Sequence, residues 1–269
     1  MGNWLRVAIW IAAVIWGTES SAAGCGEGAL PVNRDGTEGP QPARRYQVIA
    51  RRPHDPGAFT EGLVFHRGNL YESTGLYGRS SLRRIDPATG KITRIRGLPP
   101  ALFGEGLALV GDVLVQLTWR QGWVLLYRPE TLESAGRRRL AGEGWGITVL
   151  QGHLVTSDGS DTLTWRNPTD LSIERRIRIR DRAGPVAGLN ELESVQNRIL
   201  ANVWPTDCIA EIDPNSGMVT AWLDVRGLRP PALRRDPSAS ANGIAYDPDR
   251  HRLFVTGKRW PYLYVLSTE

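Results

Sequence analysis

The sequence predicts an all-β fold, and three observations support this. One phrase recurs in five versions, FTEGLVF, FGEGLAL, GWGITVL, NELESVQ and NGIAYDP, whose aligned residues are Gly62, Gly106, Gly146, Glu191 and Gly243. A second apolar run follows each phrase, as LYESTG, LVQLTW, LVTSDG, LANVWP and LFVTGK. Further apolar stretches are separated by Asp-Pro-x-x-Gly turns. Repetition at steps of 40 to 52 residues, with room for four short strands per unit, predicts a five-bladed β-propeller.

The first 24 residues predict a signal peptide that lies outside the fold. Arg6 supplies positive charge, Val7–Trp16 is an apolar run too short to span a bilayer, and Ser21–Ala23 offers small residues for cleavage. We therefore expect an exported protein. Ala22–Cys25 also resembles the lipobox of bacterial lipoproteins, in which Cys25 would carry lipid. Two locations stay open, the periplasm of a bacterium and its outer membrane, to which lipid on Cys25 would anchor the chain.

The segment that follows is expected to be a flexible tether, spanning residues 25–44, with the glycine, proline and charge content of a chain without its own core. The folded domain is expected to span residues 45–269. The sequence contains two cysteines, Cys25 and Cys208. Cys208 lies in a predicted strand, where we expect a buried thiol, and a bridge to Cys25 is the less favoured alternative.

The two ends of the propeller are expected to meet. The last unit, from Asn242 to Glu269, contains only three candidate strands, IAYD, RLFVTG and LYVLS. The segment RYQVIAR at 45–51 is expected to add the missing outer strand of that blade. Ring closure of this kind removes the free sheet edges that an open row of blades would leave.

Composition agrees with one all-β domain. The chain has 269 residues, 41% of them hydrophobic, with 30 glycines and 18 prolines for turns, and no long helical periodicity. The net charge of +5 raises the question of an acidic partner. However, basic residues alternate with apolar ones in the second half of the stretch 173–180, which is typical of an outer strand with one face in water. We therefore expect no nucleic-acid partner, and a monomer.

The repeats also predict which side chains meet at one mouth of the central channel. Neighbouring antiparallel strands place the start of one beside the end of the next. The positions before the aligned residues are Glu61, Glu105, Trp145, Asn190 and Asn242, and the second strands end at Thr74, Trp119, Asp158, Trp204 and Lys258. Carboxylates, amides, an ammonium and indoles together suit a catalytic centre with aromatic walls. Two close glutamates would raise the pKa of one of them, although either glutamate alone would be interpreted as a solvated loop carboxylate.

Other function classes fit less well. The four histidines show no paired spacing and there is no cysteine cluster, which argues against a transition metal, and no GxSxG motif indicates a serine hydrolase. Two alternatives stay open. A calcium-dependent propeller lactonase or hydrolase would hold its ion with carboxylates and amides, here Glu61, Glu105, Asn190, Asn242 and Asp158. A non-catalytic propeller would use the same mouth to bind a partner.

A collinear series of segments carries a resemblance to a known family. PHDPGAFTEGL, ESTGLYGRSSLRRIDPATGK, FGEGLAL, GWGI, LNELE, ANVWPTDCIAEI, NGIAYDP and VTGKRWP resemble the plant-type and bacterial glutaminyl-peptide cyclotransferases, or glutaminyl cyclases. The resemblance runs from about Tyr46 to the C-terminus. It implies a five-bladed propeller that converts the N-terminal glutamine of peptides or proteins into pyroglutamate with loss of ammonia, without zinc or any other cofactor.

The resemblance also implies roles for individual residues. Glu105 matches the proton-transfer group, and Lys258 and Asn190 match polar catalytic residues of the pocket. The matching substrate-binding residues are Phe59, Phe103, Trp119, Trp145 and Trp204. The donor that stabilises the developing oxyanion stays open among Lys258, Asn190 and an indole N–H. This chain departs from the family pattern with Glu61 in place of Gln and Pro205 in place of Gln. Glu61 would either attract the substrate's amino terminus or disturb the proton balance of Glu105.

Overall fold

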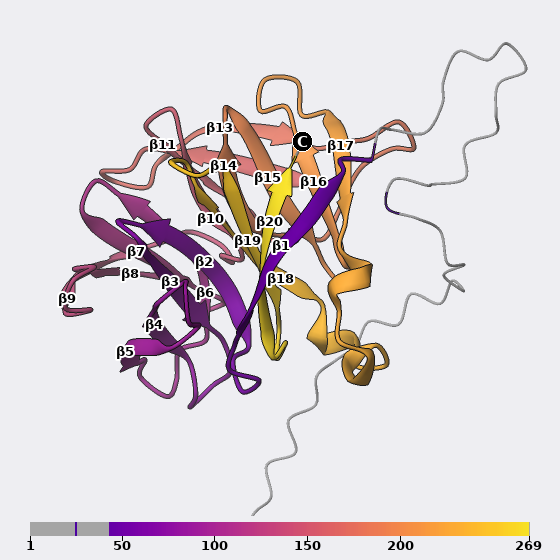
Figure 1. The fold of residues 1–269 in the computed structure, drawn as a ribbon. Helices are drawn as coiled ribbons and strands as arrows, with labels where there is room; N and C mark the ends of the chain where they lie inside the picture. Colours follow the sequence, from indigo (N-terminus) through magenta and orange to yellow (C-terminus); the bar gives the residue numbers. More distant parts are fainter. Residues whose placement is uncertain (1–24, 26–42, 269) are drawn as a thin grey trace, which may run out of the picture.

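The protein is an all-β, five-bladed β-propeller (Figure 1), as predicted. The computed structural model describes Cys25 and residues 43–268, so the predicted signal peptide and most of the predicted tether lie outside the described residues. Within the described part, twenty strands form five antiparallel sheets of four strands each. In those same residues, no helix is long and apolar enough to cross a membrane.

The blades follow one another along the chain, each ordered from the innermost to the outermost strand. Blade 1 consists of β2 (Thr60–His66), β3 (Asn69–Thr74), β4 (Ser81–Ile85) and β5 (Ile92–Gly97). Blade 2 consists of β6 (Gly104–Val110), β7 (Val113–Thr118), β8 (Trp123–Tyr127) and β9 (Ser134–Arg139). Blade 3 consists of β10 (Ile147–Leu150), β11 (His153–Thr156), β12 (Thr162–Arg166) and β13 (Ile173–Arg178).

The two remaining blades complete the ring. Blade 4 consists of β14 (Leu189–Val195), β15 (Arg198–Val203), β16 (Cys208–Ile212) and β17 (Val219–Asp224). Three short 3₁₀ helices, η1 (Arg226–Leu228), η2 (Pro231–Leu233) and η3 (Pro237–Ala239), lead to blade 5. Blade 5 consists of β18 (Ala241–Asp247), β19 (Arg252–Gly257), β20 (Tyr262–Thr268) and β1 (Tyr46–Pro53), which pairs antiparallel with β20 at the outer edge (Figure 1).

The hydrophobic core lies between the blades. In the described residues, each of the five core clusters joins two neighbouring blades, and one of them joins blade 5 to blade 1. The inner strands bury most of their residues, whereas outer strands such as β9 and β13 are exposed along most of their length. Burial of apolar faces between sheets is what holds such a ring together.

The repeated glycine has a direct structural cause. The inner strands meet backbone to backbone around the channel, so a Cβ at Gly106 would lie 2.7 Å from the carbonyl oxygen of Trp145, and one at Gly62 would lie 2.5 Å from the nitrogen of Leu107. Only glycine permits this approach. In blade 4 the equivalent residue is Glu191, whose buried carboxylate accepts hydrogen bonds from the backbone nitrogens of Leu63 and Ile244.

The cysteines form a disulfide, Cys25–Cys208, so the prediction of a buried free thiol at Cys208 is wrong. The described residues directly before β1 also lie against the edge of blade 4. Ala43 forms a parallel bridge to Trp222, and Arg44 pairs with Glu211 at 2.7 Å. The sulfur of Cys25 is consumed in this bond, which also contradicts the lipid anchor considered for that residue.

Candidate active site

The first residues of each inner strand lie at the same rim as the last residues of the next strand. The registers pair Thr60 with Thr74 in blade 1, Gly104 with Thr118 in blade 2, and Ala241 with Gly257 in blade 5. In these three blades the inner strand shifts its register directly after this point. The side chains at the start of the inner strands therefore come from different blades and face one mouth of the ring.

Glu61 and Lys258 form a buried ion pair at this mouth. Lys258 Nζ lies 2.9 Å from Glu61 Oε1, and the two side chains are 7% and 2% exposed. Asn242 Nδ2 donates a hydrogen bond to Glu61 Oε2 at 2.9 Å. Each carboxylate oxygen thus has a partner, as a buried charge requires. Glu61 belongs to blade 1 while Asn242 and Lys258 belong to blade 5, so the pair joins the first and last blades.

Glu105, at the start of the inner strand of blade 2, is a buried carboxyl with a strongly raised pKa. Burial is the largest cause of a pKa well above the usual value, the charge of Glu61 raises it further, and Lys258 opposes the rise. Burial also raises the pKa of Glu61, against the opposing effects of Lys258 and Asn242. Glu61 has two partners at 2.9 Å, and these contacts favour the negative charge on Glu61 and the proton on Glu105.

Two groups of aromatic rings lie at this mouth. Phe103 lies between Phe59 and Trp119, with ring centroids 6.2 and 5.5 Å away. Trp145 meets Trp204 edge to face at 6.0 Å. Lys258 Nζ lies 4.7 Å from the centroid of Phe59, so the ammonium faces this wall.

Two glycines give these rings their space. The ring of Phe103 packs on Gly75, and the ring of Trp145 packs on Gly159, where a Cβ would lie 2.7 Å from the indole. Gly75 follows β3, the second strand of blade 1, and Gly159 follows β11, the second strand of blade 3. The loops that close the rim therefore have no side chain where the aromatic walls lie.

Asn190, at the start of the inner strand of blade 4, is 2% exposed. Its main-chain oxygen accepts a hydrogen bond of 2.6 Å from the hydroxyl of Ser157, which in turn accepts one of 2.7 Å from the nitrogen of Gly146. These contacts fix Asn190 beside Trp145. Its side-chain Oδ1 is buried and has no partner within the described residues, so it is available to a donor of a bound molecule.

Comparison with known proteins places this geometry in a family. A family model for glutamine cyclotransferases matches residues 22–268. The chain belongs to the glutamine cyclotransferase family. The glutaminyl-peptide cyclotransferase of Arabidopsis thaliana is 40% identical over 226 residues, which are 82% of this chain and 70% of that relative. The crystal structure of Myxococcus xanthus glutaminyl cyclase matches with a TM-score of 0.78 and 35% identity, over 85% of this chain and 99% of that one. The resemblance inferred from sequence motifs is thus confirmed.

Not every residue predicted at the rim faces this cyclotransferase site. Thr74 is buried and its hydroxyl lies 2.7 Å from that of Ser81. Asp158 is exposed, and its carboxylate accepts the backbone N–H of Ser160 at 3.1 Å. Trp204 is 43% exposed, so it forms the outer part of the wall.

The site does not suit the calcium alternative. Both oxygens of Glu61 are occupied by Lys258 and Asn242, and the carboxylate of Asp158 turns into its own loop. Among Cys25 and residues 43–268, no three His, Cys, Asp or Glu side chains gather as metal ligands would. The ammonium of Lys258, in contact with one of the proposed ligands, would also repel a cation.

Glu143, which contacts two of the predicted wall residues, was not predicted from the sequence. Glu143 lies in the loop before Trp145, and its Oε2 accepts hydrogen bonds from the indole nitrogens of Trp119 at 2.8 Å and of Trp145 at 3.2 Å. The residue lies outside the aligned positions of the repeat, so the register gave no signal for it. In the sequence, Glu143 followed by Gly144 is typical of an ordinary solvated loop.

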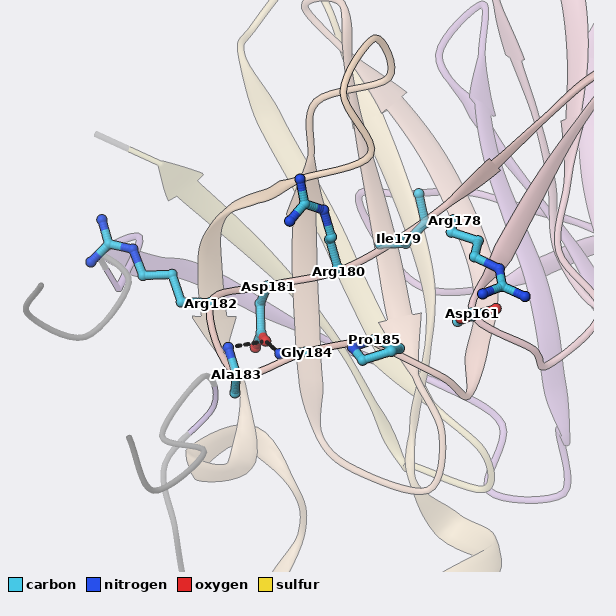
Figure 2. A pocket seen from close by; sticks show the side chains of 9 residues that line it. All are labelled: Asp161, Arg178, Ile179, Arg180, Asp181, Arg182, Ala183, Gly184 and Pro185. Carbon is cyan, nitrogen blue, oxygen red and sulfur yellow. Dashed lines mark hydrogen bonds between the residues drawn. The ribbon is translucent and has the colours of Figure 1, made fainter. Parts of the chain in front are cut away.

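A hollow elsewhere on the propeller shares no residue with the site. Figure 2 shows its lining side chains, in which Asp181 accepts hydrogen bonds from the backbone nitrogens of Ala183 and Gly184. The lining consists of Asp161, Arg178, Ile179, Arg180, Asp181, Arg182, Ala183, Gly184 and Pro185. None of the candidate catalytic or substrate-binding residues contributes to it, so it has no part in the chemistry considered below.

Proposed function

We propose that the chain is a glutaminyl-peptide cyclotransferase, which converts the N-terminal glutamine of peptides or proteins into pyroglutamate and releases ammonia. Family membership supports the activity. The observation that carries the proposal is Glu105, a buried carboxyl with a raised pKa, at a mouth walled by aromatic rings. Such a group holds a proton near neutral pH and can exchange it with a substrate.

The aromatic walls select the folded-back form of an uncharged side chain. The reaction joins the substrate's α-nitrogen to the carbon of its own γ-carboxamide, so the two must be held within bonding approach. Phe59, Phe103, Trp119, Trp145 and Trp204 supply flat apolar surfaces for the methylene groups and the amide face. Confinement of this kind removes most of the entropic part of the barrier, which is on the order of 7 kcal/mol or more for well-oriented intramolecular reactions.

Glu105 moves one proton during the reaction. The neutral α-amine attacks the γ-carbon, a nitrogen–carbon bond forms, and the carbonyl oxygen takes up negative charge. Glu105 gives its proton to the amide nitrogen, the bond between that nitrogen and the carbon breaks, and ammonia leaves. The resulting carboxylate takes the proton that the attacking nitrogen loses, so Glu105 ends the cycle protonated again.

Lys258 is the donor we assign to the oxyanion. The indole nitrogens of Trp119 and Trp145 already donate to Glu143, so neither is free for this task. Lys258 carries three N–H groups and contacts Glu61 with its ammonium, so it can donate to a substrate oxygen as well. A preorganised donor of this kind stabilises the transition state by about 3 kcal/mol. Asn190, with its unpartnered Oδ1, orients the substrate's nitrogen.

We further propose an exported, monomeric enzyme. Residues 1–24 serve as a signal peptide, the propeller is the catalytic domain, and residues 25–44 become a covalently fastened N-terminal segment. The Cys25–Cys208 disulfide supports an oxidising compartment such as the bacterial periplasm, where such bonds persist. The substrates are peptides or proteins with an N-terminal glutamine, and no nucleic acid is involved.

The test is release of ammonia from a glutamine-initiated dipeptide derivative by the purified, oxidised chain. We expect release that persists in the presence of a chelator and that is about 10² to 10⁴ slower in Glu105→Gln. A folded wild-type sample that binds the dipeptide without releasing ammonia would identify a binding module instead. Release that stops with chelator would overturn the metal-free route.

A further inference from the structure

One carboxylate holds two walls of the pocket at once. Glu143 Oε2 accepts both indole N–H groups, from Trp119 in blade 2 at 2.8 Å and from Trp145 at the start of blade 3 at 3.2 Å. The two rings belong to loops of different blades, and no other contact in the described residues joins their polar edges. A partly buried indole N–H that loses its acceptor has to turn toward water or stay unpaired.

The other oxygen of the same carboxylate is also held. Arg120 Nε donates to Glu143 Oε1 at 3.1 Å, and the guanidinium of Arg120 lies 4.0 Å from the centroid of the Trp119 ring. Glu143 therefore has a fixed orientation, because each oxygen has its own donor. Arg120 thus contacts both the face of the Trp119 ring and the carboxylate that accepts its N–H.

We propose that Glu143 is a positioning residue, which sets the angles of Trp119 and Trp145 and so the width of the pocket in which glutamine folds back. This inference rests on the proposed cyclotransferase function, since it concerns the same pocket. Glu143 does not touch the reacting atoms in this assignment. It acts through two indoles, and a displacement of about 1 Å at such a wall costs on the order of 10²-fold in rate.

The geometry separates the role of the hydrogen bonds from that of the charge. Both indoles donate to one oxygen, Oε2, so a glutamine at this position can keep both bonds with its amide oxygen. It loses the bond from Arg120 and also the charge, which in wild type raises the pKa of Glu105. Alanine removes both bonds. Glu143→Gln and Glu143→Ala thus form a matched pair, and Glu133→Ala, which removes an exposed carboxylate from the outer part of blade 2, is the control.

The experiment uses kinetics and NMR on the full oxidised chain. We expect Glu143→Ala to lower kcat/KM for the glutamine dipeptide by about 10- to 100-fold, Glu143→Gln to stay within about threefold of wild type, and Glu133→Ala to match wild type. In ¹H–¹⁵N spectra, the indole resonances of Trp119 and Trp145, assigned with Trp119→Phe and Trp145→Phe, should move in Glu143→Ala and lose protection from solvent exchange. Thermal unfolding shows whether each variant is folded.

The NMR and kinetic results together distinguish a positioning role of Glu143 from an effect of its charge. Indole resonances that stay in place in folded Glu143→Ala would overturn the inference, whether or not the protein is an enzyme. Resonances that move while kcat/KM stays unchanged would overturn its functional part. Equal impairment of Glu143→Gln and Glu143→Ala would assign the effect to charge, against positioning. A folded wild-type protein that releases no ammonia would instead refute the cyclotransferase proposal, and the indole shifts would still test the contact.

Discussion

Burial and a neighbouring negative charge both raise the pKa of Glu105, so its carboxyl group can hold a proton for transfer to the substrate. It is 5% exposed, and its pKa is raised first by burial and then by the neighbouring charge of Glu61. We predict that Glu105→Gln lowers kcat by about 10² to 10⁴, the range of general acid–base catalysis, with little change in KM because the side chains have the same shape. Ammonia release at saturating dipeptide measures this. A kcat within threefold of wild type would remove Glu105 from the reaction.

Glu61 sets the proton affinity of Glu105. Its charge raises the pKa of Glu105, while Lys258 lowers it. In Glu61→Gln the first effect disappears and Lys258 loses its partner at 2.9 Å, so both changes lower the pKa of Glu105. If the protonated form donates to the leaving nitrogen, activity falls once the pH exceeds that pKa. We therefore predict that the alkaline limb of the kcat/KM profile moves to lower pH, and an upward shift would contradict this electrostatic scheme.

At the residue scale, the sequence predicted site residues that occupy aligned positions of the repeat, but not those in the connecting loops. Glu105, Trp145 and Asn190 occupy equivalent positions of the register, so a chain pattern predicted that they share a rim. Glu143 lies in a connecting loop, and its role arises from where two indole nitrogens point, which no repeat records. The pairing of Cys25 was likewise hidden, because it depends on the path of a segment outside the repeats.

Strand β14 contains a buried carboxyl group whose ionisation lowers the stability of the fold. Glu193 accepts the backbone N–H of Tyr246 at 2.8 Å, and burial raises its pKa to about 8, against the effect of that hydrogen bond. In the unfolded chain the pKa is near 4.5. The folded form binds the proton more tightly, so the stability is full below pH 4.5 and is lost as the pH rises toward 8.

We predict that Glu193→Gln flattens this dependence. Without screening by solvent, titration of Glu193 would lower the unfolding free energy of wild type by about 1.4 kcal/mol for each pH unit between these limits. Because the side chain is not fully enclosed, we expect a total loss of only about 2 kcal/mol over the whole interval. The glutamine keeps an acceptor for Tyr246 but does not titrate. Urea unfolding at pH 5 and pH 8 measures the difference. If both proteins lose the same stability between the two pH values, Glu193 is not the titrating group.

Sequence patterns predicted the strands well, but they did not predict the 3₁₀ helices between β17 and β18. The inner strands follow the repeated phrases because close packing around the channel needs glycine there. The step from Glu191 to Gly243 is the longest of the four, and the structure gives the cause. The connection between β17 and β18 contains three 3₁₀ helices, and their proline-rich turns carry no strand period that could have predicted them.

The whole molecule is a ring whose stability is shared among blade interfaces. Five core clusters alternate with five sheets in the described residues, so each blade depends on two neighbours. The site follows from this arrangement, because Glu61 and Lys258 belong to blades at opposite ends of the chain. Loss of the contact between blades 1 and 5 would separate these two groups. Catalysis by this mouth is thus a property of the closed ring.

The Cys25–Cys208 bond fastens the chain at a separation of 183 residues. A loop of that length loses much conformational freedom in the unfolded state when it is closed, which corresponds to about 2 to 5 kcal/mol for native bonds. We predict that Cys25→Ser lowers the Tm by about 10 °C, and that dithiothreitol lowers wild type by the same amount while leaving the variant unchanged. Because both cysteines pack in the core cluster between blades 3 and 4, ammonia release at 25 °C should stay within twofold of wild type. A variant with an unchanged Tm would show that the bond constrains no part of the chain that matters for stability, and the ion pair of Arg44 with Glu211 would then be enough to hold the segment before β1 against blade 4.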